Sequence, residues 1–338
     1  MKKVAVAVSG GVDSATTAYL LKSQGYDCFG VTMVLFENPS FLEDAKKVCE
    51  QVGIPHHVID LSSEFKEEVI NYFISEYEKG RTPNPCVKCN RLIKFGRFIE
   101  EAFKLGADFF ATGHYVKKID DAIYISDNMA KDQSYFLGQI KKEFLPKIMF
   151  PLYEKDKSET RSIAKESGLS VHDKKDSQEV CFISTDYKDF LSKYIDMNIS
   201  GNIKDSKGNI IKKHNGIYTF TIGQRKGMGI ASPEPLYVLS INPKTGDVVV
   251  GSNEELFTRE LICFDINLLT EESLDALVGQ ELFAKIRSRD TLHAVKIEKI
   301  SENRVKLLFA EGVRAITPGQ IAALYTAEHR LLASGWIE

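Results

Sequence analysis

The sequence predicts an α/β protein. It has an N-terminal doubly wound parallel-sheet domain, a small central β-rich domain and a C-terminal domain resembling a β-barrel. Short apolar strands alternate with helices over the first 115 residues, a pattern typical of a parallel sheet covered on both faces. Beyond about residue 200, short strands follow one another with Gly, Pro and Asn at the turns. A chain of 338 residues is long enough for two or three domains with separate cores.

The first domain is expected to hold four strands, at Val4–Val8, Cys28–Val34, His56–Asp60 and Asp108–Thr112. Three helices between them are expected to end at Gly25, at Gly53 and, for the helix Arg91–Leu105, at Gly106. In each case a glycine follows the last apolar turn, where a left-handed C-cap is favoured. This alternation of strands and glycine-terminated helices therefore indicates repeated strand–helix units.

Residues 120–185 are expected to form short strands, a helix near Ser158–Gly168 and a polar loop. The later strands are expected at Gly201–Lys204, Ile210–Lys213, Ile217–Thr221, Leu236–Ile241, Asp247–Gly251, Glu281–Ser288, Thr291–Lys299 and Arg304–Phe309. These patterns predict three domains, at residues 1–192, 193–258 and 259–338.

Composition excludes some classes of protein and leaves others open. No run of about 18 apolar residues is present, so no membrane span is expected. The apolar stretch Val4–Val8 is shorter than the core of a signal peptide, which favours a cytoplasmic protein. The net charge of −3 argues weakly against nucleic-acid binding, although a local basic patch would still permit it.

The segment Ser9–Ser14 (SGGVDS) follows the first strand and opens the first helix. Its glycines allow close approach of a phosphate, and the helix start offers free N–H groups. Asp13 would repel a bare anion, but it suits a site where it holds Mg²⁺ on a pyrophosphate. Alternatively, Ser and Asp only cap a helix after a glycine turn. The segment fits neither G-x-x-x-x-G-K-[ST] nor G-x-G-x-x-G.

The cysteines divide into two groups. Cys86 and Cys89 lie in a proline-stiffened segment, Pro83–Asn90, that is expected to be a loop between two helices. Cys181 lies much later, after Lys174 and Lys175, whose positive charge would favour a thiolate. A structural zinc half-site at the CxxC is an alternative, but zinc needs a second ligand pair, and the sequence has no second CxxC. Three further cysteines are expected in the core: Cys28, Cys49 and Cys263.

Several segments occur in a fixed order along nearly the entire chain: SGGVDS, GRTPNPCVKCNRLIKF, ATGHY, KDQSYFL, KKDSQEVCFI, GQRKGMGI, EPLYV and TPGQ. The first resembles the PP-loop of ATP pyrophosphatases, a superfamily that includes NAD, GMP and asparagine synthetases. Together, the segments resemble the bacterial tRNA-specific 2-thiouridylase family (MnmA/TrmU type). Relative to that family, the segment after Phe36 is short.

The resemblance implies a reaction and its partners. ATP, with Mg²⁺, adenylates the C2 carbonyl of the wobble uridine in the anticodon arm of a tRNA. An upstream sulfur-donor or persulfide-carrier protein loads a persulfide on Cys181, and its sulfur replaces the activated oxygen. Cys89 then resolves the persulfide as a Cys89–Cys181 disulfide. The products are 2-thiouridine, AMP and pyrophosphate.

The resemblance also implies which residues bind the substrates. The nucleotide is expected at Ala7, Val8, Ser9, Gly10, Gly11, Val12, Asp13, Ser14, Met33 and Gly113. The tRNA is expected at Asn84, Pro85, Cys86, His114, Lys131, Asp132, Gln133, Arg287, Ser288 and Gln320. A glycine-rich basic loop with Arg225 and Lys226 would suit a sugar–phosphate backbone.

One position departs from the family, because many members have aspartate where this chain has Cys86. With cysteine at this position, the chain has a CxxC and a distant third cysteine: Cys86, Cys89 and Cys181. Related thiolases use such a set of three cysteines to hold a [4Fe–4S] cluster with one open iron, so a cluster is an alternative to the persulfide. Three other functions remain open: a small-molecule PP-loop ligase or amidotransferase-type synthetase, a nucleic-acid-binding module with an inactive loop, and a sulfur carrier without ligase activity.

Overall fold

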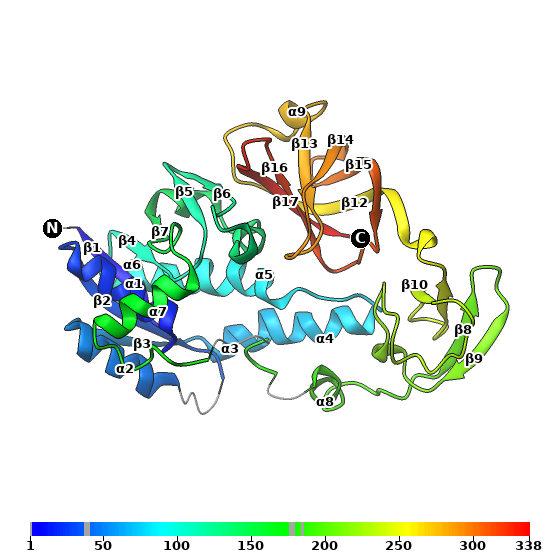
Figure 1. The fold of residues 1–338 in the computed structure, drawn as a ribbon, viewed down its shortest axis with the longest axis horizontal. Coiled ribbons are helices and arrows are strands. Elements are labelled where there is room, and N and C mark those ends of the chain that lie inside the picture. Colours follow the sequence, from blue (N-terminus) through cyan, green and yellow to red (C-terminus); the bar gives the residue numbers. More distant parts are fainter. Residues whose placement is uncertain (1, 37–40, 176–179, 184–185) are drawn as a thin grey trace.

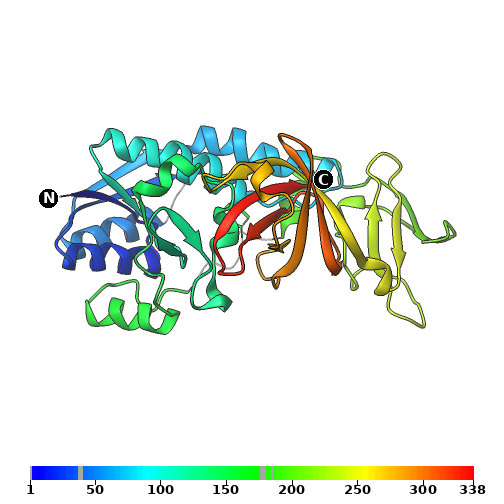
Figure 2. The same cartoon turned by 90° about the horizontal axis from the view of Figure 1, so that it is seen from above.

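In the computed structural model, which describes residues 2–36, 41–175, 180–183 and 186–338, the chain forms three parts along the long axis of the molecule (Figure 1). The parallel-sheet part lies at one end and the small central sheet at the other. The barrel lies between them, above the helix α4 in Figure 1, and Figure 2 shows the same order from above. None of the helices formed by the described residues has the length and apolar character that a membrane crossing requires.

The N-terminal sheet has the strand order β3-β2-β1-β4-β7, and all its pairs are parallel. Its strands are β1 (Lys3–Ala7), β2 (Asp27–Val34), β3 (His56–Asp60), β4 (Phe109–Ala111) and β7 (Ile148–Met149). Val4 and Val6 belong to the core on one face, and Ala5 to the core on the other face. The predicted doubly wound fold is confirmed. The strand order reverses between β1 and β4, where such sheets bind ligands.

Helices cover both faces of this sheet. Helices α1 (Val12–Ser23), α2 (Phe41–Val52) and α7 (Lys157–Glu166) pack on the face that holds Val4 and Val6. The opposite core is covered by two long helices, each with a π-helical stretch in its middle. One runs through α3 (Ser62–Phe65), Lys66–Ile70 and α4 (Asn71–Glu78), and the other through α5 (Pro85–Cys89), Asn90–Phe98 and α6 (Ile99–Lys104).

The expectation of a loop at Pro83–Asn90 was wrong, because both cysteines of the CxxC lie in the helix α5. The Asn84 side-chain oxygen Oδ1 accepts the Val87 N–H at 3.2 Å, and Pro85 occupies the first helical position. An asparagine cap followed by proline is a favoured way to begin a helix. The Asn-Pro pair was therefore a helix-start signal as well as a stiffening element.

After β4, the chain adds short elements before the central part. These are the hairpin β5 (Lys117–Ile119) and β6 (Ala122–Tyr124), and 3₁₀ turns at Met129–Lys131, Ser134–Leu137 and Lys142–Lys147. Helix α8 (Tyr187–Leu191) then precedes a sheet of order β10-β11-β8-β9. Its strands are β8 (Gly201–Asp205), β9 (Ile210–His214), β10 (Tyr237–Ile241) and β11 (Val248–Gly251).

The strand expected at Ile217–Thr221 was also wrong. Residues Ile217–Thr219 form a 3₁₀ turn, in which the Thr219 hydroxyl donates to the Gly216 carbonyl at 2.7 Å. Ile217, Tyr218 and Phe220 are all buried. A buried apolar run of this length does not distinguish a strand from a tight turn.

The C-terminal part is a closed barrel of order β12-β15-β14-β13-β16-β17, which confirms the predicted barrel. A 3₁₀ turn at Glu254–Leu256 leads into it, and α9 (Leu274–Leu277) interrupts it. Its strands are β12 (Phe257–Leu268), β13 (Leu282–Lys285), β14 (His293–Ser301), β15 (Arg304–Arg314), β16 (Ile321–Tyr325) and β17 (Leu331–Ile337).

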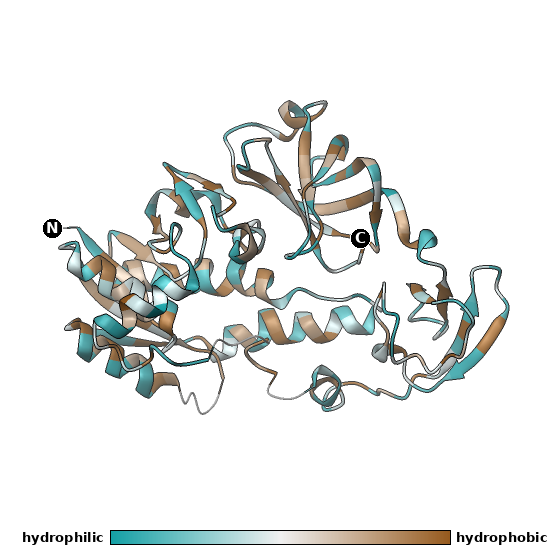
Figure 3. Ribbon diagram, in the orientation of Figure 1, coloured by the Kyte–Doolittle hydropathy of each residue, from teal (hydrophilic) through white to brown (hydrophobic). Residues whose placement is uncertain are grey.

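The parts share cores where they meet. Ile321, Tyr325 and Trp336 of the barrel belong to the same buried cluster as the helices on the N-terminal sheet. The central sheet packs instead on Phe73 and Tyr77 of α4. Hydrophobic and hydrophilic residues alternate along α4 (Figure 3), as expected for a helix that buries one face.

Candidate nucleotide and cysteine site

The phosphate loop connects β1 to α1 at the carboxyl end of the sheet. Gly10 has φ +68°, and a Cβ there would lie 2.7 Å from the Phe41 carbonyl oxygen, so only glycine fits. The Ser9 N–H donates to Ser14 Oγ at 3.1 Å, and Ser14 Oγ donates to the Gly11 carbonyl at 3.0 Å. Gly11 caps α1, and no side chain forms a capping hydrogen bond there. The first N–H groups of α1 therefore face outward as an anion site, contrary to the alternative that Ser and Asp only cap the helix.

Asp13 is neutralised by neighbours from other segments. Lys157 Nζ lies 2.7 Å from both carboxylate oxygens of Asp13, and the Tyr115 hydroxyl donates to Oδ1 at 2.7 Å. The Asp13 side chain remains about one-third exposed. One accessible carboxylate suits Mg²⁺, which is usually held by one or two carboxylates, substrate phosphates and water.

Met33 and Gly113, which are also expected to bind the nucleotide, lie at the same edge of the sheet. A Cβ at Gly113 would lie 2.9 Å from the Asp13 carbonyl carbon and 3.0 Å from the Ser14 nitrogen. Gly113 is therefore required by its packing on the start of α1. Met33 lies near the end of β2, next to Thr32, whose hydroxyl donates to the Val8 carbonyl at 2.7 Å. The residues predicted to bind the nucleotide come from three stretches of sequence, and all three lie at this edge of the sheet.

The CxxC spacing places Cys86 and Cys89 on one face of α5. Cys86 is exposed, Cys89 is half-buried, and Cys181 is exposed in a turn beyond the N-terminal sheet. The ring of the neighbouring Phe182 packs against Phe65 at 5.6 Å and Phe73 at 5.3 Å between centroids. All six cysteines are free thiols, and Cys28, Cys49 and Cys263 are buried.

The three accessible thiols share one electrostatic environment. Desolvation of the sulfur atoms by surrounding protein atoms raises the pKa of Cys89 to about 12 and the pKa of Cys181 to about 11, although the Cys181 residue as a whole is exposed. Negative charge on one sulfur further raises the pKa of its neighbours, since Cys89 responds to both Cys181 and Cys86. The Lys94 ammonium lowers the pKa of all three thiols. These groups are therefore mainly protonated at neutral pH in this arrangement.

The expected activation of Cys181 by Lys174 and Lys175 was wrong. The positive group that acts on Cys181 is Lys94, which lies in the π-helical stretch after Cys89. Lys174 instead contacts Asp44 and the phosphate loop. Proximity in the sequence therefore did not indicate which positive charge lies near the Cys181 thiol.

The described residues contain no group of three or more Cys, His, Asp or Glu side chains that could hold a metal ion. Cys86, Cys89 and Cys181 are close enough to influence one another's pKa, but they do not form a ligand set in this arrangement. The alternative of a [4Fe–4S] cluster therefore finds no ligand set among the described residues, and no reaction step is derived through a cluster.

Two residues expected near the target base, His114 and Gln133, are held by neighbouring groups of the N-terminal part. His114 packs on Phe95 and Phe150, and its Nδ1 lies 2.8 Å from the Thr112 hydroxyl. Burial and the Lys94 charge lower the pKa of His114 well below its usual value, so the ring is neutral. Gln133 Oε1 accepts the Tyr115 N–H at 2.9 Å.

Lys131 and Asp132 differ in exposure. Lys131 is exposed, whereas Asp132 is buried. The Asp132 carboxylate accepts the Ser134 hydroxyl at 2.7 Å and lies 3.4 Å from Lys285 Nζ of the barrel. Asp132 thus joins two parts of the molecule, and its side chain offers little surface to a ligand.

Among the barrel residues that are expected to contact RNA, Gln320 reaches the start of helix α5. Gln320 Nε2 donates to the Thr82 carbonyl at 2.8 Å, and Gln320 Oε1 accepts the Asn84 amide at 3.2 Å. Arg287 donates to the Ala315 carbonyl and to the Thr317 hydroxyl. Ser288 is half-buried beside Arg287.

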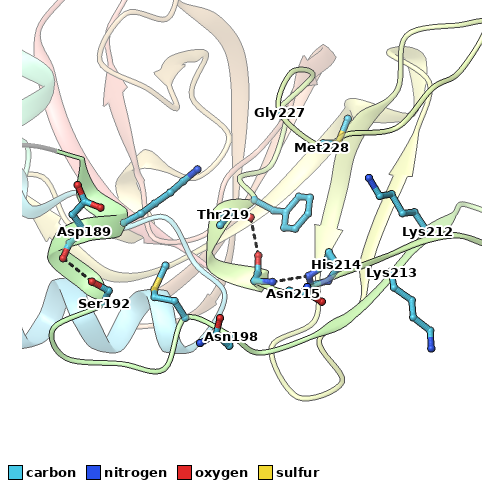
Figure 4. A pocket seen from close by; sticks show the side chains of 14 residues that line it. Asp189, Ser192, Asn198, Lys212, Lys213, His214, Asn215, Thr219, Gly227 and Met228 are labelled. Carbon is cyan, nitrogen blue, oxygen red and sulfur yellow. Dashed lines mark hydrogen bonds between the residues drawn. The ribbon is translucent and has the colours of Figure 1, made fainter.

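The central part offers a separate basic surface. Arg225 and Lys226 are exposed in their loop. Beside this loop lies an open pocket of about 620 Å³ (Figure 4), whose lining includes Lys188, Lys212 and Lys213.

Sequence reasoning missed four residues that shape the site: Arg91, Lys94, Lys157 and Lys174 in its structural role. Arg91 and Lys94 stand inside the segment GRTPNPCVKCNRLIKF, directly after the CxxC. Positively charged residues two and five positions after Cys89 were a usable signal. Lys157 reaches Asp13 across 144 residues, and nothing in a single sequence indicates such a contact.

Comparisons with known proteins cover the whole chain. Family models match residues 2–185 (tRNA methyl transferase HUP domain), 188–252 (tRNA methyl transferase PRC-barrel domain) and 258–337 (Aminomethyltransferase beta-barrel domain). The tRNA-specific 2-thiouridylase MnmA 1 of Fusobacterium nucleatum is 48% identical, over 99% of this chain and 93% of the relative. MnmA 1 of Clostridium botulinum (strain Okra) is 45% identical, over 99% and 98%. MnmA of Clostridioides difficile is 42% identical, over 97% and 96%.

Proposed function

The chain belongs to the tRNA-specific 2-thiouridylase (MnmA) family, and we propose that it uses ATP to replace the C2 oxygen of a tRNA wobble uridine with sulfur. It is thus a tRNA sulfurtransferase. The observation that carries the proposal is the pairing of an uncapped phosphate loop with three accessible thiols in one protein. A synthetase acting on small molecules needs the loop but not the thiols.

The first step activates the carbonyl. The N–H groups at the start of α1 bind the phosphates, and the uridine C2 oxygen attacks the α-phosphorus of ATP. The bond to pyrophosphate breaks, and the C2 oxygen becomes part of an adenylate. Asp13 would hold Mg²⁺, which neutralises phosphate charge when bound. The target base must leave its stack for this step.

The second step transfers sulfur. Cys181 carries a persulfide, whose terminal sulfur attacks C2 and displaces AMP. The Cys89 thiolate then attacks the Cys181 sulfur, which forms a Cys89–Cys181 disulfide and leaves the sulfur double-bonded to C2. A thiol reductant must open that disulfide before the next turnover. Lys94 stabilises the thiolates, because its charge lowers the pKa of all three thiols.

The partners follow from this chemistry. The wobble uridine would lie near Asn84, Pro85, Cys86, His114, Lys131 and Gln133, and the anticodon arm near Arg287, Ser288 and Gln320. The persulfide requires a protein that donates sulfur in a cytoplasmic setting. We also assign residues 1–192 as the catalytic domain, 193–258 as the central tRNA-contacting domain and 259–338 as the barrel domain. Each of the three main sheets falls essentially within one of these ranges.

Nucleoside mass analysis tests the function. The protein is incubated with tRNA, ATP, Mg²⁺ and a sulfur source, and the tRNA is digested. The proposal predicts 2-thiouridine only when ATP and tRNA are both present. ATP–pyrophosphate exchange that is equally fast without tRNA, and no thiolated nucleoside, would instead indicate a small-molecule ligase.

A further inference from the structure

The phosphate loop brings no positive side chain of its own to a highly charged ligand. The segment Ser9–Ser14 contains no lysine or arginine. In the described part of the chain, lysines from two distant segments reach the loop. Lys157 contacts Asp13, and Lys174 Nζ donates to the Gly10 carbonyl at 2.9 Å.

The Lys174 ammonium is held beside the loop but remains accessible. It pairs with Asp44 of α2 at 2.6 Å, and the two side chains are 40% and 37% exposed. A Cβ added to Gly10 would lie 2.9 Å from Asp44 Cβ, so this ion pair lies directly against the loop. An exposed ion pair is weak in water, and a phosphate oxygen can therefore replace Asp44.

The backbone that carries Lys174 is anchored on α7. Arg161 Nη1 donates to the His172 carbonyl at 2.7 Å, and Nη2 donates to the Lys174 carbonyl at 2.8 Å. The long lysine side chain is thus presented from a fixed main chain.

We propose that Lys174 binds the phosphates of the nucleoside triphosphate. Lys174 exchanges Asp44 for phosphate oxygens when ATP enters the loop. This inference rests on the ATP-dependent function proposed above and deepens it.

Binding of ATP with Mg²⁺ in the absence of tRNA tests the proposal. Lys174→Gln is compared with Lys175→Gln, because Lys175 is an exposed neighbour of the same charge. Loss of one charge-assisted contact should weaken ATP binding roughly tenfold in Lys174→Gln. Lys175→Gln should stay within about twofold, and Lys174→Arg should regain most of the affinity, since the contact is largely electrostatic. Equal affinity of Lys174→Gln and parent, or equal losses in both glutamine variants, would overturn the proposal.

Asp44→Asn tests the exchange of Asp44 for phosphate. This variant should bind ATP at least as tightly as the parent, because a competing carboxylate is removed. Weaker binding by Asp44→Asn would count against the exchange. If the parent itself bound no ATP, the proposed function would fail rather than this inference alone.

Discussion

The helix that carries Cys86 and Cys89 and the turn that carries Cys181 are held by different parts of the molecule. Helix α5 is fixed by the barrel at both ends, through Gln320 on one side and Asp265 on the other. The Cys181 turn is held mainly by Phe182, which packs in an aromatic group with Phe65 and Phe73. In the proposed mechanism, the resolving thiol of Cys89 would therefore lie on a helix held by the barrel, and the persulfide of Cys181 on a turn held separately.

The ion pair between Arg91 and Asp265, here called the clamp, connects the helix that carries Cys86 and Cys89 to the barrel. Asp265 has φ +52° at a register shift in β12, where a non-glycine residue is strained. Its carboxylate forms a two-point ion pair with Arg91, and Arg91 also donates to Gln139 at 2.7 Å. Gln139 in turn donates to Ser334 of β17. This network connects the barrel to a residue two positions after Cys89.

Removal of either thiol should have the largest effect. Cys89→Ser and Cys181→Ser should each abolish 2-thiouridine formation under multiple turnover, because one sulfur carries the persulfide and the other resolves it. tRNA affinity, measured by filter binding, should change less than about twofold, because the thiols are not the main RNA contacts. Full activity of Cys181→Ser would refute its role as the carrier.

Loss of the clamp should have the next largest effect. Asp265→Asn should lower kcat about tenfold, since small displacements of catalytic groups are costly, while the KM for ATP stays near the parent value. Stability should fall by about 1–2 kcal/mol, because the pair is partly exposed. Denaturant unfolding and steady-state kinetics measure both quantities.

Glu271→Gln is the matched control for the clamp. Lys142 and Glu271 form another ion pair between the same two parts at 2.9 Å, distant in sequence from the CxxC, and Glu271 is 92% exposed. This variant should keep kcat within about twofold, as expected for an exposed ion pair. If both variants lose kcat equally, the clamp has no special role in positioning α5.

The shared environment of the thiols predicts a pH dependence. Because the pKa of Cys89 is raised to about 12, its thiolate fraction should rise about tenfold per pH unit from pH 7 to pH 10. The alkylation rate of Cys89 should follow that rise. Lys94 lowers this pKa, so Lys94→Met should slow alkylation severalfold at pH 8. A plateau in the parent below pH 9 would show an activated thiol instead.

Gln320 should give the smallest effect of this series. Its amide bonds the Thr82 and Pro83 carbonyls and Asn84, at the start of the cysteine helix. Gln320→Ala should reduce kcat/KM for tRNA about threefold, consistent with loss of a neutral hydrogen bond. An effect larger than that of Asp265→Asn would mean that the N-terminal end of α5 matters more than the Arg91 end.

The parallel sheet and the phosphate loop could be predicted from local sequence. Strands such as Val4–Val8 are uniformly apolar, and the glycines that end the helices at 25, 53 and 106 all adopt positive φ. The 3₁₀ turn at Ile217–Thr219 could not be predicted, because its buried side chains follow from packing against α4 rather than from a local period.

The site was predictable where motifs are continuous and less so where it is assembled from distant segments. Ser9–Ser14 and the CxxC are local patterns. The contacts of Asp13 with Lys157 and of Arg91 with Asp265 span 144 and 174 residues. Such pairs depend on how the domains dock, and the sequence around either partner contains no signal of the other. The assignment of Lys174 to Cys181 was wrong for the same reason.

A single-turnover reaction without reductant tests the central claim most directly. Protein carrying a persulfide on Cys181 is mixed with tRNA and ATP, quenched with an alkylating agent, and divided for nucleoside and peptide mass analysis. The account predicts one Cys89–Cys181 disulfide for each 2-thiouridine formed. Formation of 2-thiouridine while Cys89 and Cys181 are both recovered as free thiols would contradict it.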